Sequence, residues 1–251
     1  MRFLRYKSSG NVYYGWSHEH LVGHVDGNIF GDFRRMEANM DIDEIKLSYP
    51  VLPSKIICVG RNYATHAAEH GVEVPDIPML FLKPPSSIIG TKESIVLPPQ
   101  SNQVEHEAEL AVVIGKQGRW IKPDETDDYI LGYTIANDVT ARDLQRRDGQ
   151  WTRGKGFDTF CPIGPWIDTE FDPADALITC KVNNEVRQMA STRDMVFPVS
   201  HLIAFASSIM TLMPGDLLLT GTPAGVGILN PGDKVEVEIE GLGILSNTVM
   251  K

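Results

Sequence analysis

The chain has 251 residues, of which 42% are hydrophobic, and this is enough to build one sizeable core with a small appended domain. Its 33 acidic and 23 basic residues give a formal net charge of −10, which argues against nucleic acid and anionic membranes as partners. The 3 cysteines are scattered, no apolar run is long enough to span a bilayer, and the start of the chain lacks a signal-peptide pattern. We therefore expect a cytoplasmic protein.

Residues 1–52 differ in pattern from the rest of the chain. Short aromatic and β-branched pieces in "NVYYGWSHEHLVGHVDGNIFGDF" are separated by glycines, which predicts short strands joined by turns. The following "MDIDEIKLSYPVLPSK" contains prolines and is typical of a connector. We predict a small N-terminal β domain with its connector over residues 1–52, and a second domain over residues 53–251.

Beyond this boundary the pattern is mostly β, with a few short helices. "KIICVGRNY" predicts a buried strand that runs into a loop, and "THAAEHG" predicts a short helix ended by Gly71. "DDYILGYTIANDVTARDLQ" predicts a strand that ends near Asn137 before a helix, and "VSHLIAFASSIMTLM" has the spacing of an amphipathic helix. Because strands and helices do not alternate regularly, the pattern argues against a doubly wound sheet.

The stretch "VEHEAELAVVIG" places Glu105, Glu107 and Glu109 on alternate positions, so in a single strand their side chains would share one face. "VEVEIE", residues 235–240, also alternates glutamates, but there the intervening residues form a clean apolar face, as in an ordinary half-exposed strand. Glu109 instead borders a run that is apolar on both faces. A buried carboxylate is costly unless a cation lies nearby. The alternation alone fits a solvated face and a binding site about equally well.

Asp138 follows the predicted strand that ends near Asn137. Its ordinary role would be the N-cap of the next helix, since aspartate is a common residue there. Its alternative role is a third oxygen ligand beside Glu107 and Glu109. Hard cations such as Mg²⁺ bind carboxylate oxygens and usually keep some waters, which leaves positions for a substrate.

Three further residues also have two interpretations. His66 and Glu69 are spaced i, i+3 on a helical turn, so they form either a surface pair or a general base with its orienting carboxylate. Lys155, between two glycines, either lies in solvent or reaches an oxygen that becomes negative during a reaction. "LTGTPAGVG" lacks the P-loop pattern and predicts a tight turn whose backbone N–H groups and Thr222 hydroxyl line a pocket.

Several stretches, taken together in order and spacing, resemble the fumarylacetoacetate hydrolase family from about Lys55 to the C-terminus: "CVGRNYATHAAE", "LFLKPPSSIIG", "EHEAELAVVIG", "GYTIANDVTARDLQ", "GKGFDTFCPIGP" and "PGDLLLTGTPAGVG". The resemblance implies a mixed β-roll, usually dimeric, that holds Mg²⁺ or sometimes Mn²⁺ or Ca²⁺. It implies metal ligands at Glu107, Glu109 and Asp138, catalytic roles for His66, Glu69 and Lys155, and substrate contacts from Arg142, Gln145 and Thr222. Glu105 falls outside the family motif and is expected to be solvated or to lie behind the metal ligands.

The namesake enzyme of the family uses an aspartate upstream of the paired histidine, and "VGRNYATH" has none. The chain is therefore similar to the shorter, three-carboxylate branch, which implies small 2-oxo acids as substrates. We expect hydrolysis of a C–C bond in acylpyruvates or decarboxylation of oxaloacetate, through an enolate stabilised by the metal. The alternatives are isomerisation of 2-hydroxyhepta-2,4-diene-1,7-dioate and, outside enzymes, a β protein with a structural cation site.

Overall fold

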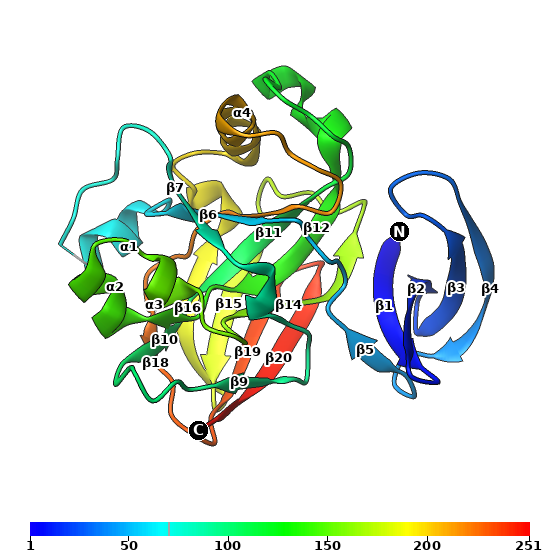
Figure 1. Ribbon diagram of the computed structural model, residues 1–251, viewed down its shortest axis with the longest axis horizontal. Helices are drawn as coiled ribbons and strands as arrows, with labels where there is room; N and C mark the ends of the chain where they lie inside the picture. The colour runs from blue at the N-terminus through cyan, green and yellow to red at the C-terminus, as the bar shows by residue number, and fades with distance from the viewer. Residues whose placement is uncertain (70) are drawn as a thin grey trace.

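The computed structural model describes residues 1–69 and 71–251. A long mixed sheet crosses the molecule, and two smaller sheets pack beside it (Figure 1). The long sheet has the order β4 (Phe33–Asp41), β3 (Leu21–Gly27), β2 (Asn11–His18), β1 (Arg2–Ser8), β14 (Cys161–Asp168), β12 (Ile130–Asn137), β11 (Ala108–Ile114), β17 (Leu217–Leu219), β6 (Ile56–Gly60) and β7 (Met79–Lys83), with β5 (Lys46–Ser48) on β1 and β8 (Ile88–Ile89) on β14. The mostly β fold class predicted from the sequence is confirmed.

The smaller sheets complete the β architecture. One has the order β13 (Thr140–Ala141), β10 (Val104–His106) and β18 (Gly227–Ile228). The other has the order β16 (Glu185–Ser191), β15 (Leu177–Val182), β19 (Lys234–Ile239), β20 (Gly243–Met250) and β9 (Ser94–Val96). In β19 the valines and isoleucine are buried while Glu236 and Glu238 are partly exposed, as "VEVEIE" predicts.

The N-terminal strands β1 to β5 lie together at one end of the molecule (Figure 1). Strand β1 pairs antiparallel with β14 through Arg2 opposite Asp168 and Phe3 opposite Ile167, so these strands continue the long sheet. The short strands and turns expected from the glycine-punctuated sequence are present. The division into two domains at residue 52 stays a prediction.

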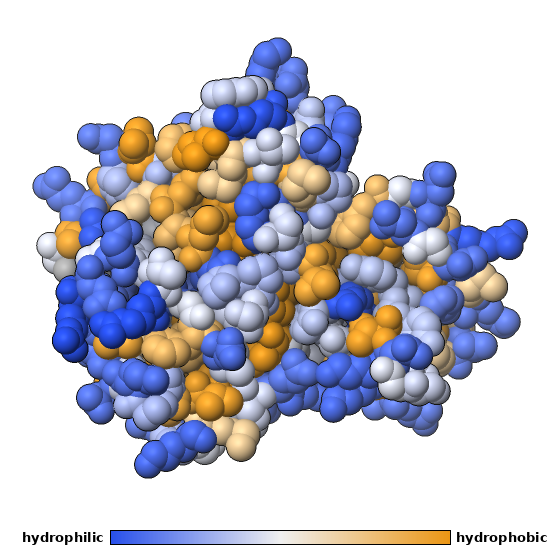
Figure 2. All heavy atoms as spheres, in the orientation of Figure 1, coloured by the Kyte–Doolittle hydropathy of each residue, from blue (hydrophilic) through white to orange (hydrophobic). Residues whose placement is uncertain are grey.

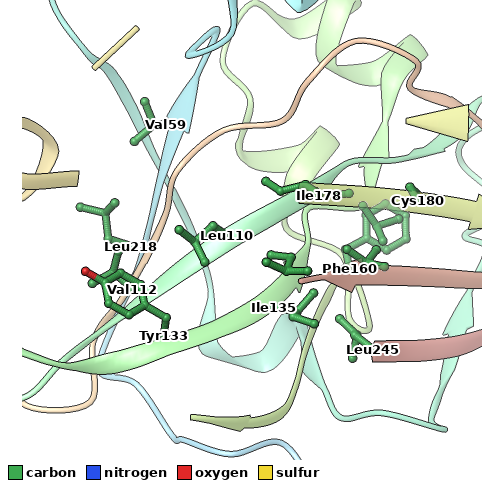
Figure 3. Packing of buried hydrophobic residues seen from close by; sticks show 14 of the residues in the cluster. Val59, Leu110, Val112, Tyr133, Ile135, Phe160, Ile178, Cys180, Leu218 and Leu245 are labelled. Carbon is green, nitrogen blue, oxygen red and sulfur yellow. The ribbon is translucent and has the colours of Figure 1, made fainter. Parts of the chain in front are cut away.

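Strand β11 is the centre of the core. All of its residues are buried, and successive side chains contribute to different clusters: Leu110 and Val112 pack into the larger one, and Ala111 and Val113 into a second one. Figure 3 shows Leu110 and Val112 among residues from several other strands. A strand that is covered on both faces has apolar residues at consecutive positions, which explains the sequence "LAVVI" of residues 110–114.

Replacing Leu110 tests this central position. Leu110→Ala removes a fully buried side chain from the larger cluster, and we expect the free energy of unfolding to fall by about 2–5 kcal/mol. Urea denaturation measures the change. The matched control is Val186→Ala on β16, where the side chain is 50% exposed and the change should stay within about 0.5 kcal/mol. Similar losses in the two variants would contradict the assignment of the core.

Short helices and 3₁₀ turns connect the strands: α1 (Ala64–Glu69), η1 (Pro85–Ser87), η2 (Pro123–Tyr129), α2 (Arg142–Asp148), α3 (Thr152–Lys155), η3 (Thr192–Asp194) and α4 (Val199–Ile209). Helix α4 buries Leu202, Ile203 and Ala206 as its predicted amphipathic pattern requires, but it ends before Met213. The predicted helix in "THAAEHG" is α1, and His70 lies outside the described residues. Across residues 1–69 and 71–251, none of the helices has the length and apolar character needed to cross a membrane.

Candidate active site

The glutamate-bearing stretch forms two strands rather than the single strand that its alternation predicts. Strand β10 ends before Glu107, and β11 begins after it in a different sheet. At the break, the Asn137 side chain accepts a hydrogen bond from the Glu107 N–H (2.9 Å), and the Glu107 carbonyl accepts one from the Asp138 N–H (2.8 Å). Gln188 Oε1 accepts one from the Ala108 N–H (3.0 Å). Side chains from distant parts of the chain thus accept the backbone hydrogen bonds that a neighbouring strand would otherwise accept. The alternation of residues along one strand does not predict such distant partners.

Glu107, Glu109 and Asp138 come together as a buried cluster. One carboxylate oxygen from each lies within 4.8 Å of the others, and all three residues are buried. The solvated interpretation of the two glutamates is therefore wrong. Asp138 is also not a helix cap, because α2 begins at Arg142 and its N-cap is Ala141.

Two buried lysines contact the carboxylate cluster. The Lys155 Nζ donates to Glu107 Oε2 and to Asp138 Oδ2, each at 2.7 Å, so it is not a loop lysine in solvent. The Lys83 Nζ donates to the other Asp138 oxygen at 2.5 Å and to the Val139 carbonyl at 3.2 Å. Lys83 was not among the site residues predicted from the sequence. Its one local signal is a lysine at the end of an apolar strand, followed by two prolines.

Arg142 joins the cluster to Glu105. Its Nε donates to Glu105 at 2.7 Å, and one of its terminal nitrogens donates to Glu107. Its other terminal nitrogen donates to Gln145 Oε1 at 2.5 Å. Glu105 was expected either in solvent or behind the metal ligands. It is only 5% exposed, so it is not solvated and lies behind the cluster.

Glu109 is electrostatically different from its neighbours. Its Oε2 accepts a hydrogen bond from the Gly221 N–H (2.7 Å), and among the described residues it forms no salt bridge. Burial first, and then the Asp138 and Glu107 charges, raise the pKa of Glu109 well above its usual value. Burial is also the largest influence on Glu107 and opposes its ionisation, but Lys155, Arg142 and His66 together outweigh burial and hold the pKa of that carboxyl below its usual range.

These donors fit a hard divalent cation. Carboxylate oxygens are the ligands that Mg²⁺, Mn²⁺ and Ca²⁺ take, and three of them converge here. Within residues 1–69 and 71–251 no neutralising side chain contacts the buried Glu109 carboxylate, so a cation at this point would relieve an unfavourable charge. Glu107, Glu109 and Asp138 are thus placed as ligands should be.

His66 and Glu69 lie on α1 and face each other as their spacing predicts. The His66 Nδ1 is 3.4 Å from Glu69 Oε2, and His66 is only 7% exposed. The Glu69 carboxylate also accepts from the Gly225 N–H, at 3.1 and 3.2 Å, so the turn after β17 holds it. His66 is therefore buried, whereas Glu69 is exposed at the surface and is held by this turn, so the pair is only partly solvated.

One pocket of about 580 Å³ joins these groups. All the predicted site residues except Asp138 line it: His66, Glu69, Glu107, Glu109, Arg142, Gln145, Lys155 and Thr222. The Thr222 hydroxyl donates to the Ala108 carbonyl (2.9 Å) and accepts from Gln188 Nε2 (2.8 Å), so it holds the pocket wall together. Gln188, which also meets His106 at 3.0 Å, was not predicted as a site residue, although the stretch "NNEVRQ" ends on it.

The family described as "Fumarylacetoacetate (FAA) hydrolase C-terminal" matches residues 55–250. The chain belongs to this family, which confirms the resemblance seen in its motifs. It is therefore an enzyme of the fumarylacetoacetate hydrolase family. It is 51% identical over 209 residues to "Oxaloacetate tautomerase Fahd2a, mitochondrial" of Rattus norvegicus, covering 79% of this chain and 67% of the rat protein.

Two solved structures bear on the site. The 5-carboxymethyl-2-hydroxymuconate delta-isomerase from Mycobacterium smegmatis matches with a TM-score of 0.92 and 42% identity, over 100% of this chain and 99% of that one. The fumarylpyruvate hydrolase from Pseudomonas aeruginosa, in complex with Mn²⁺ and pyruvate, matches with a TM-score of 0.76 and 34% identity, over 83% of this chain and 92% of that one.

The Lys83 contact can be tested through stability. Lys83→Met removes one of the two ammonium groups that touch the buried Asp138, and we expect the free energy of unfolding without divalent cation to fall by about 3–5 kcal/mol. Added Mg²⁺ should restore part of this loss, because it replaces the missing positive charge. Urea denaturation with chelator or with Mg²⁺ measures both effects.

The matched control is Lys55→Met, which breaks an ion pair with the buried Asp216 outside the pocket. Its stability loss should be the same with chelator and with Mg²⁺. An equal loss in Lys83→Met under both conditions would show that Lys83 stabilises the fold without serving the cation site.

Proposed function

We propose that the chain binds a divalent cation through Glu107, Glu109 and Asp138 and catalyses proton transfer in small 2-oxo acids, with keto–enol interconversion of oxaloacetate as the first candidate. The observation that carries this proposal is the buried carboxylate cluster at the wall of a pocket that His66 also lines; in the part of the chain that the structure describes, Glu109 of this cluster has no cationic partner. Mg²⁺ is the first choice of metal. Mn²⁺ has support from the similar Pseudomonas structure, and Ca²⁺ is a further option.

The charges of the cluster suit an anionic substrate. Four carboxylates (Glu105, Glu107, Glu109 and Asp138) face three cations (Lys83, Lys155 and Arg142), which leaves one excess negative charge when all are ionised. A bound divalent cation reverses that excess, and when bound it supplies Lewis-acid polarisation of the 2-oxo group. Lys155 adds a fixed positive charge beside the oxygen that becomes negative.

His66 is placed to move the proton. Its ring lies in the pocket wall with Glu69 on its Nδ1 side, so Glu69 orients the ring and stabilises its charged form. In the proposed reaction His66 takes a proton from the carbon beside the 2-oxo group and returns it to a different position of the same conjugated system. No attacking water is needed for this step.

C–C bond cleavage is the second candidate. The family resemblance of the sequence favours acylpyruvate hydrolysis or oxaloacetate decarboxylation, and the likeness to a fumarylpyruvate hydrolase supports C–C bond cleavage. The same His–Glu pair would then activate water. We rank proton transfer first for two reasons. The rat tautomerase is 51% identical over 79% of this chain, and the Mycobacterium smegmatis isomerase matches 100% of this chain. Isomerisation of 2-hydroxyhepta-2,4-diene-1,7-dioate belongs to the same proton-transfer class.

A substrate panel tests the proposal. The purified protein, with Mg²⁺ or with chelator, is given oxaloacetate, acetylpyruvate, fumarylpyruvate and 2-hydroxyhepta-2,4-diene-1,7-dioate, and products are followed by NMR in D₂O. We expect metal-dependent acceleration of enol–keto conversion with deuterium at the carbon beside the 2-oxo group. Cleavage of acylpyruvates without acceleration of the enol–keto conversion of oxaloacetate would support the second candidate. Inactivity on the whole panel with metal present would contradict both.

We also propose that the protein is a homodimer and that it works in the cytoplasm. The three cysteines, Cys58, Cys161 and Cys180, are buried and unpaired, as suits a reducing compartment. Light scattering and fluorescence microscopy of a tagged chain test the two statements.

A further inference from the structure

Arg61 and Arg146 line the pocket but have no hydrogen-bonded or ion-paired partner among residues 1–69 and 71–251. The other cations on its wall, Arg142 and Lys155, are bound to the carboxylate cluster. Glu69, the carboxylate on the same pocket wall outside the cluster, already accepts hydrogen bonds from the turn after β17. Two guanidinium groups at one pocket therefore lack an anion, in a chain whose net charge is −10.

The backbone holds Arg61 in an uncommon conformation. Its φ is 60°, in the left-handed region that residues other than glycine rarely occupy. On one side, Gly60 is packed so closely that an added Cβ would lie 2.8 Å from the Trp151 ring. On the other, the buried Asn62 side chain donates to the Thr220 carbonyl at 2.8 Å. Fixed neighbours thus impose this conformation, and such residues concentrate at ligand sites.

Arg146 belongs to a different wall of the same pocket. It lies one helical turn after Arg142 on α2, which ends at Asp148 with Gly149 as its C-cap. Trp151 follows and packs edge-to-face on Phe81, with ring centroids 5.1 Å apart, so an aromatic surface also lines the pocket. Figure 2 shows strongly hydrophilic surface over the α2 region at one side of this face. Arg146 is exposed and lines the pocket, so it can contact a ligand bound in the pocket.

We propose that the pocket takes 2-oxo dicarboxylic acids and that Arg61 and Arg146 bind the carboxylate remote from the 2-oxo group. The inference rests on the proposed function, because the cation at the carboxylate cluster is what would hold the other end of the acid. A guanidinium matches a carboxylate with two parallel N–H donors, which an ammonium group cannot offer. The aromatic surface of Phe81 and Trp151 accommodates the carbon chain between the two ends.

The test compares diacids with matched monoacids. Calorimetric titration of the Mn²⁺-loaded protein uses oxaloacetate, 2-oxoglutarate and 2-oxoadipate against pyruvate, 2-oxobutanoate and 2-oxopentanoate, each of which lacks only the distal carboxylate. We expect at least one diacid to bind about tenfold more tightly than its monoacid. Arg61→Gln and Arg146→Gln should each remove most of this preference while leaving monoacid affinity within about twofold.

The control is Arg147→Gln, which makes the same charge change at the next position of α2, outside the pocket, and should keep the preference. The inference is overturned if no diacid is preferred by the unmodified protein, or if the arginine variants weaken both members of a pair equally. If the Mn²⁺-loaded protein binds neither diacids nor monoacids, the proposed function itself fails. Monoacid binding without diacid preference removes only the role of the two arginines.

Discussion

Glu109→Gln is expected to weaken binding of Mg²⁺ or Mn²⁺ by well over tenfold, which corresponds to about 1.4 kcal/mol or more. The substitution keeps the size of the side chain and an oxygen that can accept from the Gly221 N–H, but it removes one ligand charge. Because Glu109 is the carboxylate of the cluster that no cation of the described residues contacts, its charge is the one that a bound metal would neutralise most directly. Calorimetric titration measures the affinity.

The same variant separates metal binding from folding. Glu109→Gln takes an uncompensated carboxylate out of the core, so the metal-free protein should be at least as stable as the unmodified one, while the gain in thermal stability on adding Mg²⁺ should be lost. The matched control is Glu238→Gln on β19, whose side chain is 46% exposed and lies 3.4 Å from Lys181. Unchanged affinity in Glu109→Gln would exclude Glu109 as a ligand.

The sequence predicted those parts of the fold that depend on local pattern. The apolar run after Glu109 is a strand covered on both faces, the strand before Asp138 ends at Asn137, and the carboxylate motif carried over by family resemblance comes together as a cluster. The two strands are recorded in a few neighbouring residues each, whereas the cluster joins Glu107 and Glu109 to the distant Asp138 and was predicted through the family resemblance. The alternation of residue types and the position of turn residues are enough to predict such strands, and the spacing of a known motif is enough to predict the cluster.

The missed features depend on partners that are far apart in the chain. Lys83 meets Asp138 across 55 positions, and Gln188 reaches the β11 backbone across 80. The break between β10 and β11 exists because such partners satisfy the backbone there, and Glu105 is buried because Arg142 accompanies it. No local pattern separates a buried lysine or glutamine of this kind from an exposed one, since both residue types usually lie at the surface.

His66→Ala is expected to lower turnover of the best substrate by roughly a hundredfold or more while leaving metal affinity nearly unchanged. His66 touches the pocket and Glu69, but it is not one of the clustered carboxylates. Glu69→Gln should cost less, because Glu69 acts through the ring. The double variant should lose little more than His66→Ala alone, since residues that act as a unit are not additive. Steady-state kinetics with saturating Mg²⁺ provides the comparison.

The pattern of loss across substrates then identifies the step that His66 performs. If it moves the proton, enol–keto conversion and deuterium exchange fall together, whereas decarboxylation of oxaloacetate, which needs little beyond electron withdrawal, suffers less. If it activates water, acylpyruvate hydrolysis falls while exchange survives. The control is His201→Ala, an exposed histidine on α4 that stacks on Phe197 outside the pocket. Full activity of His66→Ala on every substrate would remove the His–Glu pair from the chemistry and leave the cation site as the sole catalytic element.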